Sequence, residues 1–425
     1  MMKKALVLAL VLVSNLIFAQ DTYLHCGTVL DVVSGKMLSE KTIVVSGKKI
    51  KSIENGYVSG GEDDNSVNLK DKTVLPGFID MHVHIEGESS PTRYLDRFTK
   101  NDVDVAFQST VYAKRTLMAG FTTVRDLGGS GVNIALRNAI NKGVVIGPRI
   151  FTAGKAIGTT GGHADPTNGM RKEWVGNPGP KEGVVNSPED ARKAVRQRYK
   201  NGADCIKITA TGGVMSVAKN GQNPQFMEDE LKAIVATAKD YGMLTAAHAH
   251  GDEGMRRAIK AGIKTIEHGT LMKEPTMELM VQYNTYLVPT ISAGKAAARM
   301  ADIPGFLPPV VAKKAKEIGP VSQKTFKKAF QKGVPIAFGT DAGVSPHGDN
   351  GKEFTYMHEA GMPVLDALRS ATITNAELLG MGKELGQIKE GFLADIVAVN
   401  KNPFNDVTTL ENAVFVMKEG KIYKQ

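Results

Sequence analysis

Val74-Leu75-Pro76-Gly77-Phe78-Ile79-Asp80-Met81-His82-Val83-His84-Ile85 is the stretch that decides the fold, because it reads as an apolar strand ending in two histidines one residue apart. Alternate residues of a strand face the same side, so His82 and His84 point together, as two ligands of one metal ion must. Asp80 falls on that face too, and Pro76 stands at the strand entry, where its missing N–H does least harm. A His-x-His pair also occurs in loops by chance, so the rest of the chain has to decide.

Seven more short strands, rich in β-branched residues, follow this one, at 122–126, 149–153, 205–209, 244–250, 265–268, 286–290 and 336–341. Helical stretches separate them. One begins at a capped N-terminus, Ser187-Pro188-Glu189-Asp190. Many end in a glycine that can turn the chain back: Gly120, Gly202, Gly242, Gly262 and Gly333. Strands alternating with helices predict an α/β protein with a parallel sheet, and eight units favour a (β/α)₈ TIM barrel over an open doubly wound sheet.

The two ends of the chain have a different residue pattern from its middle. Residues 20–75 and 387–425 alternate apolar and polar side chains in short strands, with a hairpin turn at Glu419-Gly420. Neither end has enough strands for a stable sheet of its own. We therefore predict one small composite β-sandwich domain built from both termini, with the barrel of residues 76–386 inserted between them.

Residues 1–19 read as a secretory signal peptide, with a short basic start, an apolar run too short for a comfortable membrane span, and a small residue, Ala19, before the polar Gln20. The mature protein is then expected to be periplasmic or secreted, with no stable membrane span.

The formal charge of the chain is +9, and removal of Lys3 and Lys4 with the signal leaves 9 − 2 = +7. The basic residues are spread over helix faces between acidic ones, without a basic tail, so we expect no nucleic-acid partner. Of the two cysteines, Cys205 lies in a predicted buried strand, so no disulfide with Cys26 is expected.

Polar side chains stand at the ends of five of the eight strands, and in a barrel these ends meet at one mouth. They are His82, His84, Lys207, His248, His250, His268 and Asp341. Several imidazoles with a carboxylate suit a transition metal. Lys207 does not fit as a cation, because an ammonium repels a metal ion. It could be neutral, be carboxylated by CO₂, or pair with Asp341 or Glu228.

Five stretches of the chain resemble the amidohydrolase superfamily, in its imidazolonepropionase-like and prolidase-like branch. In chain order they are Pro76 to His84, Ile206-Lys207-Ile208, His248-Ala249-His250-Gly251, Ile266-Glu267-His268-Gly269 and Gly339-Thr340-Asp341-Ala342. Their order and separations are similar to those of the family, and the resemblance covers nearly all of the mature chain. The flanking strands resemble the small β domain of the family.

The resemblance implies two Zn²⁺ ions, or another divalent metal, held by His82, His84, Lys207, His248, His268 and Asp341. The first two histidines and the aspartate would bind the more buried ion, and the last two histidines the second. Lys207 would be carboxylated and bridge both ions. A hydroxide between the ions would attack an amide carbonyl, with Asp341 as general base and then acid.

Two further histidines match substrate positions of the family. His163, in Gly161-Gly162-His163, would hold the carbonyl or the developing oxyanion, and His250 would contact substrate. Glu267 is expected to face away from the site and to pair structurally. A carboxylate on the leaving amino acid would need a cationic partner, and Arg171 is one candidate, although a solvated surface position suits it better.

The resemblance implies cleavage of a C–N amide bond in a small-molecule or dipeptide substrate. The main reading is a dipeptidase for Xaa-Pro or Xaa-Arg/Lys, or an N-acyl amino acid or ochratoxin amidase. A lactonase or phosphotriesterase-like hydrolase on the same metals is an alternative. A catalytically inactive binding protein is another, which the complete ligand set disfavours. Relatives also suggest a homo-oligomer.

Overall fold

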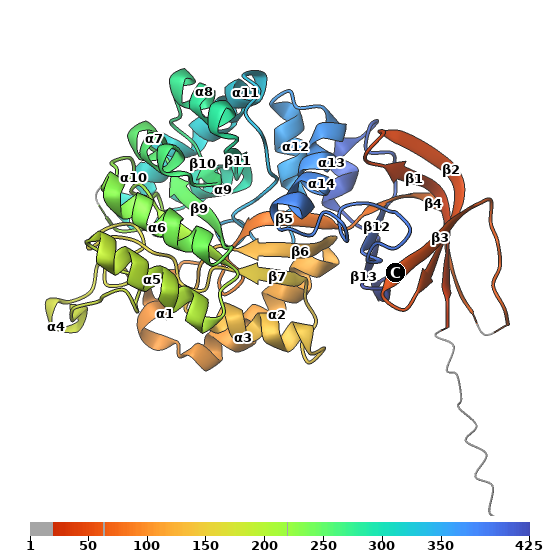
Figure 1. Cartoon of the computed structure of the whole chain (residues 1–425), viewed down its shortest axis with the longest axis horizontal. Coiled ribbons are helices and arrows are strands. Elements are labelled where there is room, and N and C mark those ends of the chain that lie inside the picture. Colours follow the sequence, from red (N-terminus) through yellow and green to blue (C-terminus); the bar gives the residue numbers. More distant parts are fainter. Residues whose placement is uncertain (1–19, 63, 219) are drawn as a thin grey trace, which may run out of the picture.

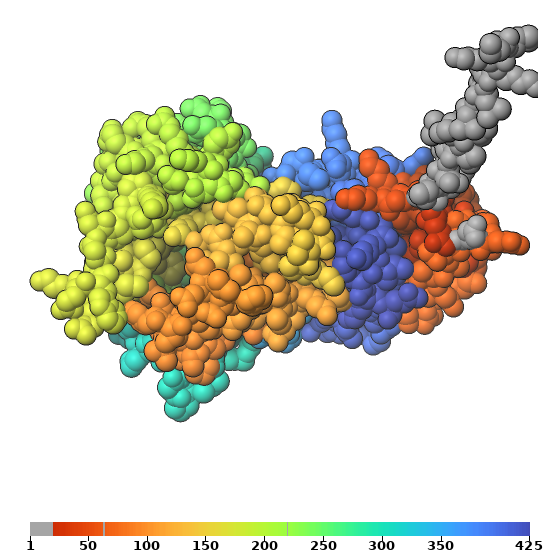
Figure 2. Space-filling model, turned by 90° about the horizontal axis from the view of Figure 1, so that it is seen from below, coloured from red at the N-terminus to blue at the C-terminus, as the bar shows by residue number. Residues whose placement is uncertain are grey.

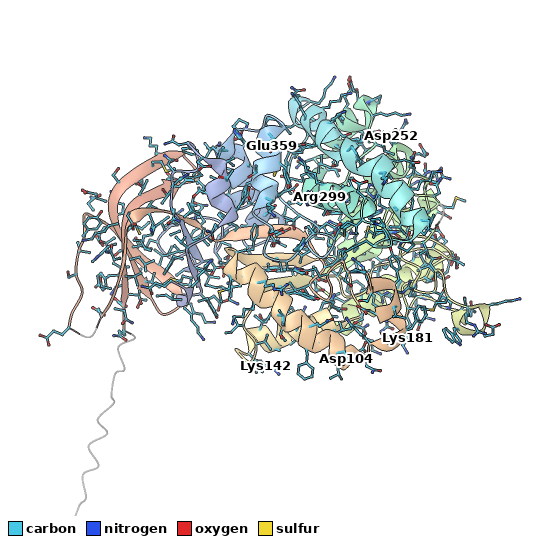
Figure 3. All side chains as sticks on the ribbon, turned by 180° about the vertical axis from the view of Figure 1, so that it is seen from behind. Asp104, Lys142, Lys181, Asp252, Arg299 and Glu359 are labelled. Carbon is cyan, nitrogen blue, oxygen red and sulfur yellow. The ribbon has the colours of Figure 1, made fainter. Side chains whose placement is uncertain are left out.

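The computed structural model describes residues 20–62, 64–218 and 220–425, so the predicted signal peptide lies outside the described residues. A sheet made from both ends of the chain stands at one end of the molecule, and the helix-covered α/β part forms the rest (Figure 1). Charged side chains such as Asp104, Lys142 and Glu359 are exposed on the outside of the helices (Figure 3). Among the described residues no helix combines the length and apolarity that a membrane crossing needs.

The terminal sheet has seven strands in the order β14-β13-β12-β4-β1-β2-β3. Its strands are β1 (Thr22–Asp31), β2 (Lys36–Ser46), β3 (Lys49–Asn55), β4 (Asn65–Pro76), β12 (Ile396–Val399), β13 (Phe415–Lys418) and β14 (Lys421–Lys424). The predicted hairpin at Glu419-Gly420 is present, with both residues at positive φ. A bridge from Lys49 to Leu393 brings the edge strand β3 back towards β12, so the sheet curls around its own apolar core. The two ends of the chain therefore build one sheet together.

The middle of the chain forms two parallel sheets. One has the order β5-β6-β7 and the other β11-β10-β9-β8. The strands are β5 (Phe78–Val83), β6 (Phe121–Asp126), β7 (Arg149–Thr152), β8 (Cys205–Thr209), β9 (Leu244–Ala249), β10 (Thr265–His268) and β11 (Tyr286–Val288). Seven of the eight predicted strands are thus present, and the α/β class is confirmed.

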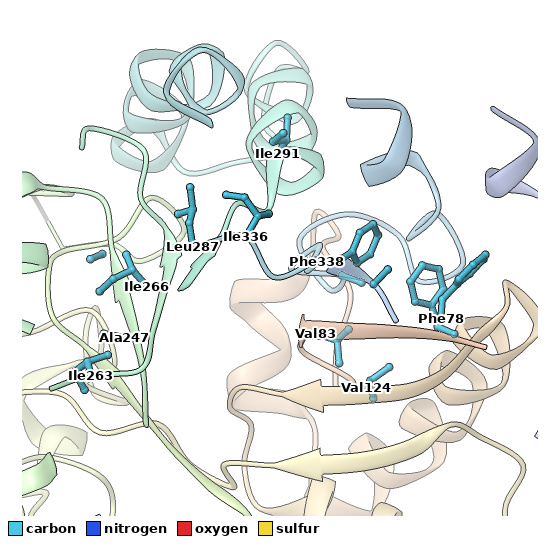
Figure 4. Packing of buried hydrophobic residues seen from close by; sticks show 14 of the residues in the cluster. Phe78, Val83, Val124, Ala247, Ile263, Ile266, Leu287, Ile291, Ile336 and Phe338 are labelled. Carbon is cyan, nitrogen blue, oxygen red and sulfur yellow. The ribbon is translucent and has the colours of Figure 1, made fainter. Parts of the chain in front are cut away.

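The eighth predicted strand is extended but pairs only through isolated bridges. Leu287 of β11 bridges Ile336, and Val83 of β5 bridges Ala342. Ile336 and Phe338 lie between these two strands in Figure 4. On the other side, a bridge from Ile157 to Ile208 links the segment after β7 to β8. Hydrogen bonds therefore connect the two parallel sheets at both of their edges.

The opening sequence stretch belongs to two strands rather than one. Val74 to Pro76 ends β4 in the terminal sheet, and β5 starts at Phe78. Gly77 joins them where a Cβ would lie 2.3 Å from Thr122 Oγ1, so only glycine fits there. The predicted single strand is wrong in this respect, because the chain crosses from one sheet to the other at this glycine.

Helices connect the parallel strands and bury apolar side chains such as Ile206, Ile266 and Leu287 beneath them. They are α1 (Arg93–Thr99), α2 (Asp102–Met118), α3 (Val132–Asn141), α4 (Lys172–Val175), α5 (Pro188–Asn201), α6 (Glu228–Asp240), α7 (Asp252–Ala261), α8 (Glu274–Tyr283), α9 (Ile291–Ala301), α10 (Pro309–Ile318), α11 (Ser322–Gln331), α12 (Lys352–Glu359), α13 (Val364–Ser370) and α14 (Ile373–Leu378), with 3₁₀ turns η1 (Gly319–Val321) and η2 (Val407–Glu411). The predicted cap of α5 is confirmed, because Ser187 Oγ accepts from Asp190 N–H at 3.2 Å. Both cysteines are buried and free.

Candidate metal centre

All eight side chains predicted to bind metal or substrate line one cavity of ≈ 620 Å³. They are His82, His84, His163, Lys207, His248, His250, His268 and Asp341. Residues of α1 and of the loops after β7 and β8 also line the cavity. Figure 2 shows a hollow between the orange and yellow-green parts of the surface, and these parts include those segments. The structure therefore brings these eight residues, from distant parts of the chain, to one cavity.

His82, His84 and Asp341 form the first group at this site. The Oδ1 atom of Asp341 lies 3.6 Å from His82 Nε2 and 3.4 Å from His84 Nε2. That oxygen is buried and has no hydrogen-bond partner. Such a group is costly to bury alone, so its orphaned state points to a ligand or a proton at this spot. The backbone of Asp341 is left-handed at φ 57°, a strained conformation of the kind found at functional sites.

The outward nitrogens of both histidines are fixed from behind. His82 Nδ1 donates to Glu267 Oε2 at 2.9 Å, and His84 Nδ1 donates to Gly128 O at 2.7 Å. Glu267 Oε1 in turn accepts from the buried Arg125 guanidinium at 2.9 Å. Each histidine therefore turns its Nε2 towards the other site residues, which is the arrangement that metal-binding histidines need.

His248, His250 and His268 form the second group, with ring centroids 4.7–4.9 Å apart. Gly212 O lies 2.9 Å from His248 Nε2, which leaves Nδ1 of this ring for a ligand. His268 Nδ1 lies 2.7 Å from Thr290 Oγ1, and His250 Nδ1 lies 2.9 Å from Thr270 Oγ1. Again one nitrogen of each ring is held by the protein.

Lys207 lies against the first group, and burial together with the charge of Lys207 lowers the pKa of His248 and His268 in the second. The Nζ of Lys207 lies 3.4 Å from His82 Nε2, and the side chain is 4% exposed. Burial lowers its pKa to about 8, although the nearby Glu267 and Asp341 raise it. Of the alternatives left open by the sequence, the structure places Lys207 near Asp341 and not near Glu228, which forms its ion pair with Lys232 on α6.

Burial keeps the histidines neutral, as metal coordination requires. Burial, together with nearby groups such as Lys207, lowers the pKa of His84 and His163 to about 3. The pKa of His248 is also far below its ordinary value for the same reason. In contrast, burial raises the pKa of Asp341 to about 7, against the opposing effect of Lys207 and Arg93.

The donor set fits divalent metal. Two groups of three side chains have ligand atoms within 4.8 Å of one another: one is His82, His268 and Asp341, and the other is His248, His250 and His268. Imidazole nitrogens with a carboxylate suit zinc and similar ions. The grouping differs from the expected one in that His250, predicted to contact substrate, stands beside the second histidine pair.

His163 lies over the second group, where its ring centroid is 4.4 Å from that of His248. Its main-chain N–H donates to Gln225 Oε1 at 2.8 Å. The buried Nδ1 has no hydrogen-bond partner. A neutral imidazole that lines the cavity can donate its ring N–H to a carbonyl oxygen of a bound molecule.

The sequence expectations for the charged residues Glu267 and Arg171 have different outcomes. Glu267 pairs structurally with Arg125 as expected, but it also bonds His82 from behind the cavity, so it does not point away from the site as predicted. The strand ends in the left-handed His268 at φ 72°, which breaks the alternation of faces. Arg171 is exposed, pairs with Glu173 and does not line the cavity, so it is the surface residue that the sequence favoured.

The sequence argument missed the residues that support the ligands. Arg125 and Thr290 carried one weak signal, a polar side chain inside or just after an apolar strand. Arg93 of α1 also lines the cavity, with Nη1 3.1 Å from Ser89 Oγ and 3.3 Å from Gly343 O, and no local pattern distinguishes it from surface arginines.

Comparison with known proteins decides the family. The model of the amidohydrolase family matches residues 73–424. The chain belongs to the amidohydrolase family. It is also 31% identical to the ochratoxinase of Aspergillus niger over 408 residues, 91% of this chain and 82% of that protein.

Solved structures agree with this assignment. A Xaa-Pro dipeptidase with methionine bound in its active site is 51% identical, with a TM-score of 0.92 over 96% of this chain and 100% of the other. A prolidase complexed with N-methylphosphonate-L-proline is 32% identical, with a TM-score of 0.87 over 96% and 100% of the two chains. This amidohydrolase is therefore a hydrolase acting on C–N amide bonds, as the sequence predicted.

Proposed function

We propose that this amidohydrolase is an exported dipeptidase that uses two divalent metal ions, most simply zinc, to cleave Xaa-Pro or Xaa-Arg/Lys dipeptides or N-acyl amino acids. The observation that carries the proposal is the buried, unpartnered carboxylate of Asp341 among imidazole nitrogens that the protein holds from behind. The high similarity to a Xaa-Pro dipeptidase supports the substrate class. The eight parallel segments are then those of a (β/α)₈ barrel.

The metal ligands in this proposal are the strand-end side chains His82, His84, Lys207, His248, His268 and Asp341. The Nζ of Lys207 lies 3.4 Å from His82 Nε2, and its charge also acts on His248 and His268. A carboxylated lysine there would supply oxygen ligands to both ions. Bound divalent ions supply an activated water and polarise the amide carbonyl.

The residues of the chain do the remaining chemistry. Asp341, with a pKa raised to about 7 by burial, can take a proton at Oδ1 and deliver it to the leaving nitrogen. His163 lines the cavity and has a nitrogen without a partner in the protein, and its ring would bond the carbonyl oxygen as it gains negative charge. His82 and His84 present their Nε2 atoms 3.6 and 3.4 Å from Asp341 Oδ1, so these three atoms can bind one cation together.

Arg93 is the group we assign to the carboxylate of the leaving amino acid. It lines the cavity and forms no ion pair among the described residues. Its charge lies close enough to lower the pKa of Asp341 and His84. The cavity of ≈ 620 Å³ can hold a dipeptide, and the arginine guanidinium can form two parallel hydrogen bonds to a carboxylate.

The test is a substrate panel with one variant and one control. Zinc-loaded protein is assayed with Xaa-Pro, Xaa-Arg and N-acyl amino acids, each as the free acid and as the C-terminal carboxamide. We expect hydrolysis of one acid class, and we expect Arg93→Met to lower kcat/KM for the acids by about 10- to 100-fold, the strength of a hydrogen bond to a charged group. The carboxamides should change much less.

Arg171→Met is the matched control, because Arg171 is exposed and away from the cavity. It should leave all rates unchanged. If no member of the panel is hydrolysed, the dipeptidase proposal is wrong. If acids and carboxamides respond equally to Arg93→Met, the assigned role of Arg93 is wrong.

Export forms part of the proposal because residues 1–19 have the pattern of a signal peptide. Expression of the full chain in a bacterial host and fractionation checks it. The mature protein should begin at or near Gln20 and leave the cytoplasm with the periplasmic or culture fraction. An intact N-terminus in the cytoplasmic fraction contradicts it.

A further inference from the structure

The loop after β8 shapes two of the histidines at the site. Gly212 O lies 2.9 Å from His248 Nε2 and so fixes which nitrogen of that ring faces the cavity. The next residue, Gly213, packs so tightly under His163 that a Cβ would lie 2.2–2.4 Å from its ring atoms. Residues 214–216 then form part of the cavity wall. The conformation of this loop therefore sets the orientation of both rings.

Lys314, on the buried face of α10, holds this loop from behind. Its Nζ donates to three main-chain carbonyls of the loop, Gly213 O at 2.7 Å, Ser216 O at 2.7 Å and Ala218 O at 2.8 Å. The side chain is 5% exposed and forms no ion pair among the described residues. Burial lowers its pKa to about 8. All three ammonium protons are thus used on one loop.

A buried ammonium without a carboxylate is costly unless its protons are bonded. Here the three carbonyls of residues 213, 216 and 218 are brought together only when the loop has its observed shape. Any other shape would leave the cation of Lys314 unsatisfied. The charge thereby selects one loop conformation, an effect that a packed apolar side chain would not reproduce.

We infer that Lys314 is a positioning residue for catalysis, which orders the 212–218 loop and through it orients His248 and His163. Lys314 does not itself line the cavity, so it acts through the loop and not on the substrate. The inference rests on the proposed function only for the roles of these two histidines. The ordering of the loop stands independently of it.

The experiment compares Lys314→Met, which keeps the length of the side chain without its charge, with Lys313→Met. Lys313 is the adjacent residue on α10 and is exposed, so it serves as a matched control. Hydrogen–deuterium exchange of residues 212–218 is measured on both variants and on the unaltered protein, together with kcat and KM and the affinity for zinc.

In Lys314→Met we expect exchange of the loop amides to rise about tenfold or more. We expect kcat and zinc affinity to fall about 10- to 100-fold, as for outer-shell partners of metal ligands, with a smaller change in KM. Lys313→Met should match the unaltered protein. A lower Tm with unchanged loop exchange and kcat would overturn the inference, because the lysine would then contribute to stability alone.

Chemical rescue keeps the test decisive if Lys314→Met does not fold. Lys314→Ala is prepared with and without ethylammonium, which can place an ammonium among the three carbonyls. Restored loop protection and kcat in this variant, with no effect on the unaltered protein, support the inference, and absence of rescue counts against it. A failure of the proposed function would show in the unaltered protein as missing zinc or missing hydrolysis, whereas the loop exchange needs neither metal nor substrate.

Discussion

At the scale of single residues, the site combines predicted ligands with supports that the sequence did not reveal. His82 and His84 could be predicted because strand alternation puts them on one face, and Asp341 because it stands at another strand end. Glu267 could not be assigned correctly, since the left-handed backbone at His268 interrupts that alternation. Arg125 gave only a weak signal, a polar side chain inside an apolar strand, because its role depends on a contact with a residue 142 positions later.

The Arg125–Glu267 pair gives the first residue-scale prediction. Both side chains are fully buried, and Glu267 also holds His82. Arg125→Met should therefore leave an unpaired buried carboxylate and cost about 3–5 kcal/mol of unfolding free energy. Chemical denaturation measures this loss, and zinc titration should show affinity lower by about 10- to 100-fold.

A comparison with the exposed Arg171–Glu173 pair shows whether burial causes the loss of stability predicted for Arg125→Met. Its side chains are 69% and 66% exposed, so Arg171→Met should change stability by less than about 1 kcal/mol. Equal effects of the Arg125 and Arg171 substitutions would contradict the role assigned to the buried pair.

At the scale of elements, the positions of strands and helix caps could be predicted, while the junctions between elements could not. The pattern of β-branched runs located seven parallel strands, and Gly202 and Gly262 end their helices in the left-handed conformation expected for them. The crossing from β4 to β5 lies beside the domain boundary expected at 75/76, but the sequence did not show that Val74 to Pro76 belong to a strand of the other sheet, because both strands are apolar and one glycine separates them. The eighth segment has strand composition but few ladder hydrogen bonds.

Gly77 therefore provides the element-scale prediction. A Cβ at this position would lie 2.3 Å from Thr122 Oγ1, so Gly77→Ala should force β5 and β6 apart. We expect a loss of about 1–3 kcal/mol, typical of overpacking, measured as a lower denaturation midpoint. Gly179→Ala is the control, because nothing lies within 4 Å of a Cβ there. If Gly77→Ala is as stable as that control, the close approach of the two strands is wrong.

At the scale of the whole molecule, ion pairs hold the terminal sheet against the parallel strands. Arg149 of β7 bonds Asp395 and Glu419 at 2.8 Å each, across the boundary between the two parts. The sequence predicted that both chain ends would join in one unit. It could not predict these pairs, because contacts some 250 residues apart leave no local pattern.

Acid stability tests this boundary. Burial raises the pKa of Glu419, but hydrogen bonds from Lys48 and Arg149 outweigh it and hold the pKa below its ordinary value of 4.5. A lowered folded-state pKa stabilises the protein above the unfolded pKa, and this stability is lost as pH falls below about 4.5 through the folded pKa. Arg149→Met should cost about 3 kcal/mol at pH 7, since Asp395 stays buried without its partner, and should flatten the pH dependence of stability near pH 4.

Lys48→Met is the control for this prediction, because Lys48 pairs with the same Glu419 while 71% exposed. It should cost less than about 1 kcal/mol at pH 7. The denaturation midpoints of both variants and of the unaltered protein are compared from about pH 3 to about pH 7, a range that includes the ordinary pKa of carboxylates. An unchanged pH slope in Arg149→Met would show that the boundary does not depend on this arginine.

Metal titration of chelator-treated protein tests the central claim, that the strand-end side chains hold a pair of catalytic ions, most directly. Zinc is added in steps while amide hydrolysis and bound metal are measured on the same samples. We predict that activity is absent without metal and saturates at about two equivalents per chain, and that Lys207→Met binds fewer ions and stays inactive with added bicarbonate. Full activity in the metal-free protein, or full zinc binding and activity in Lys207→Met, would contradict the account.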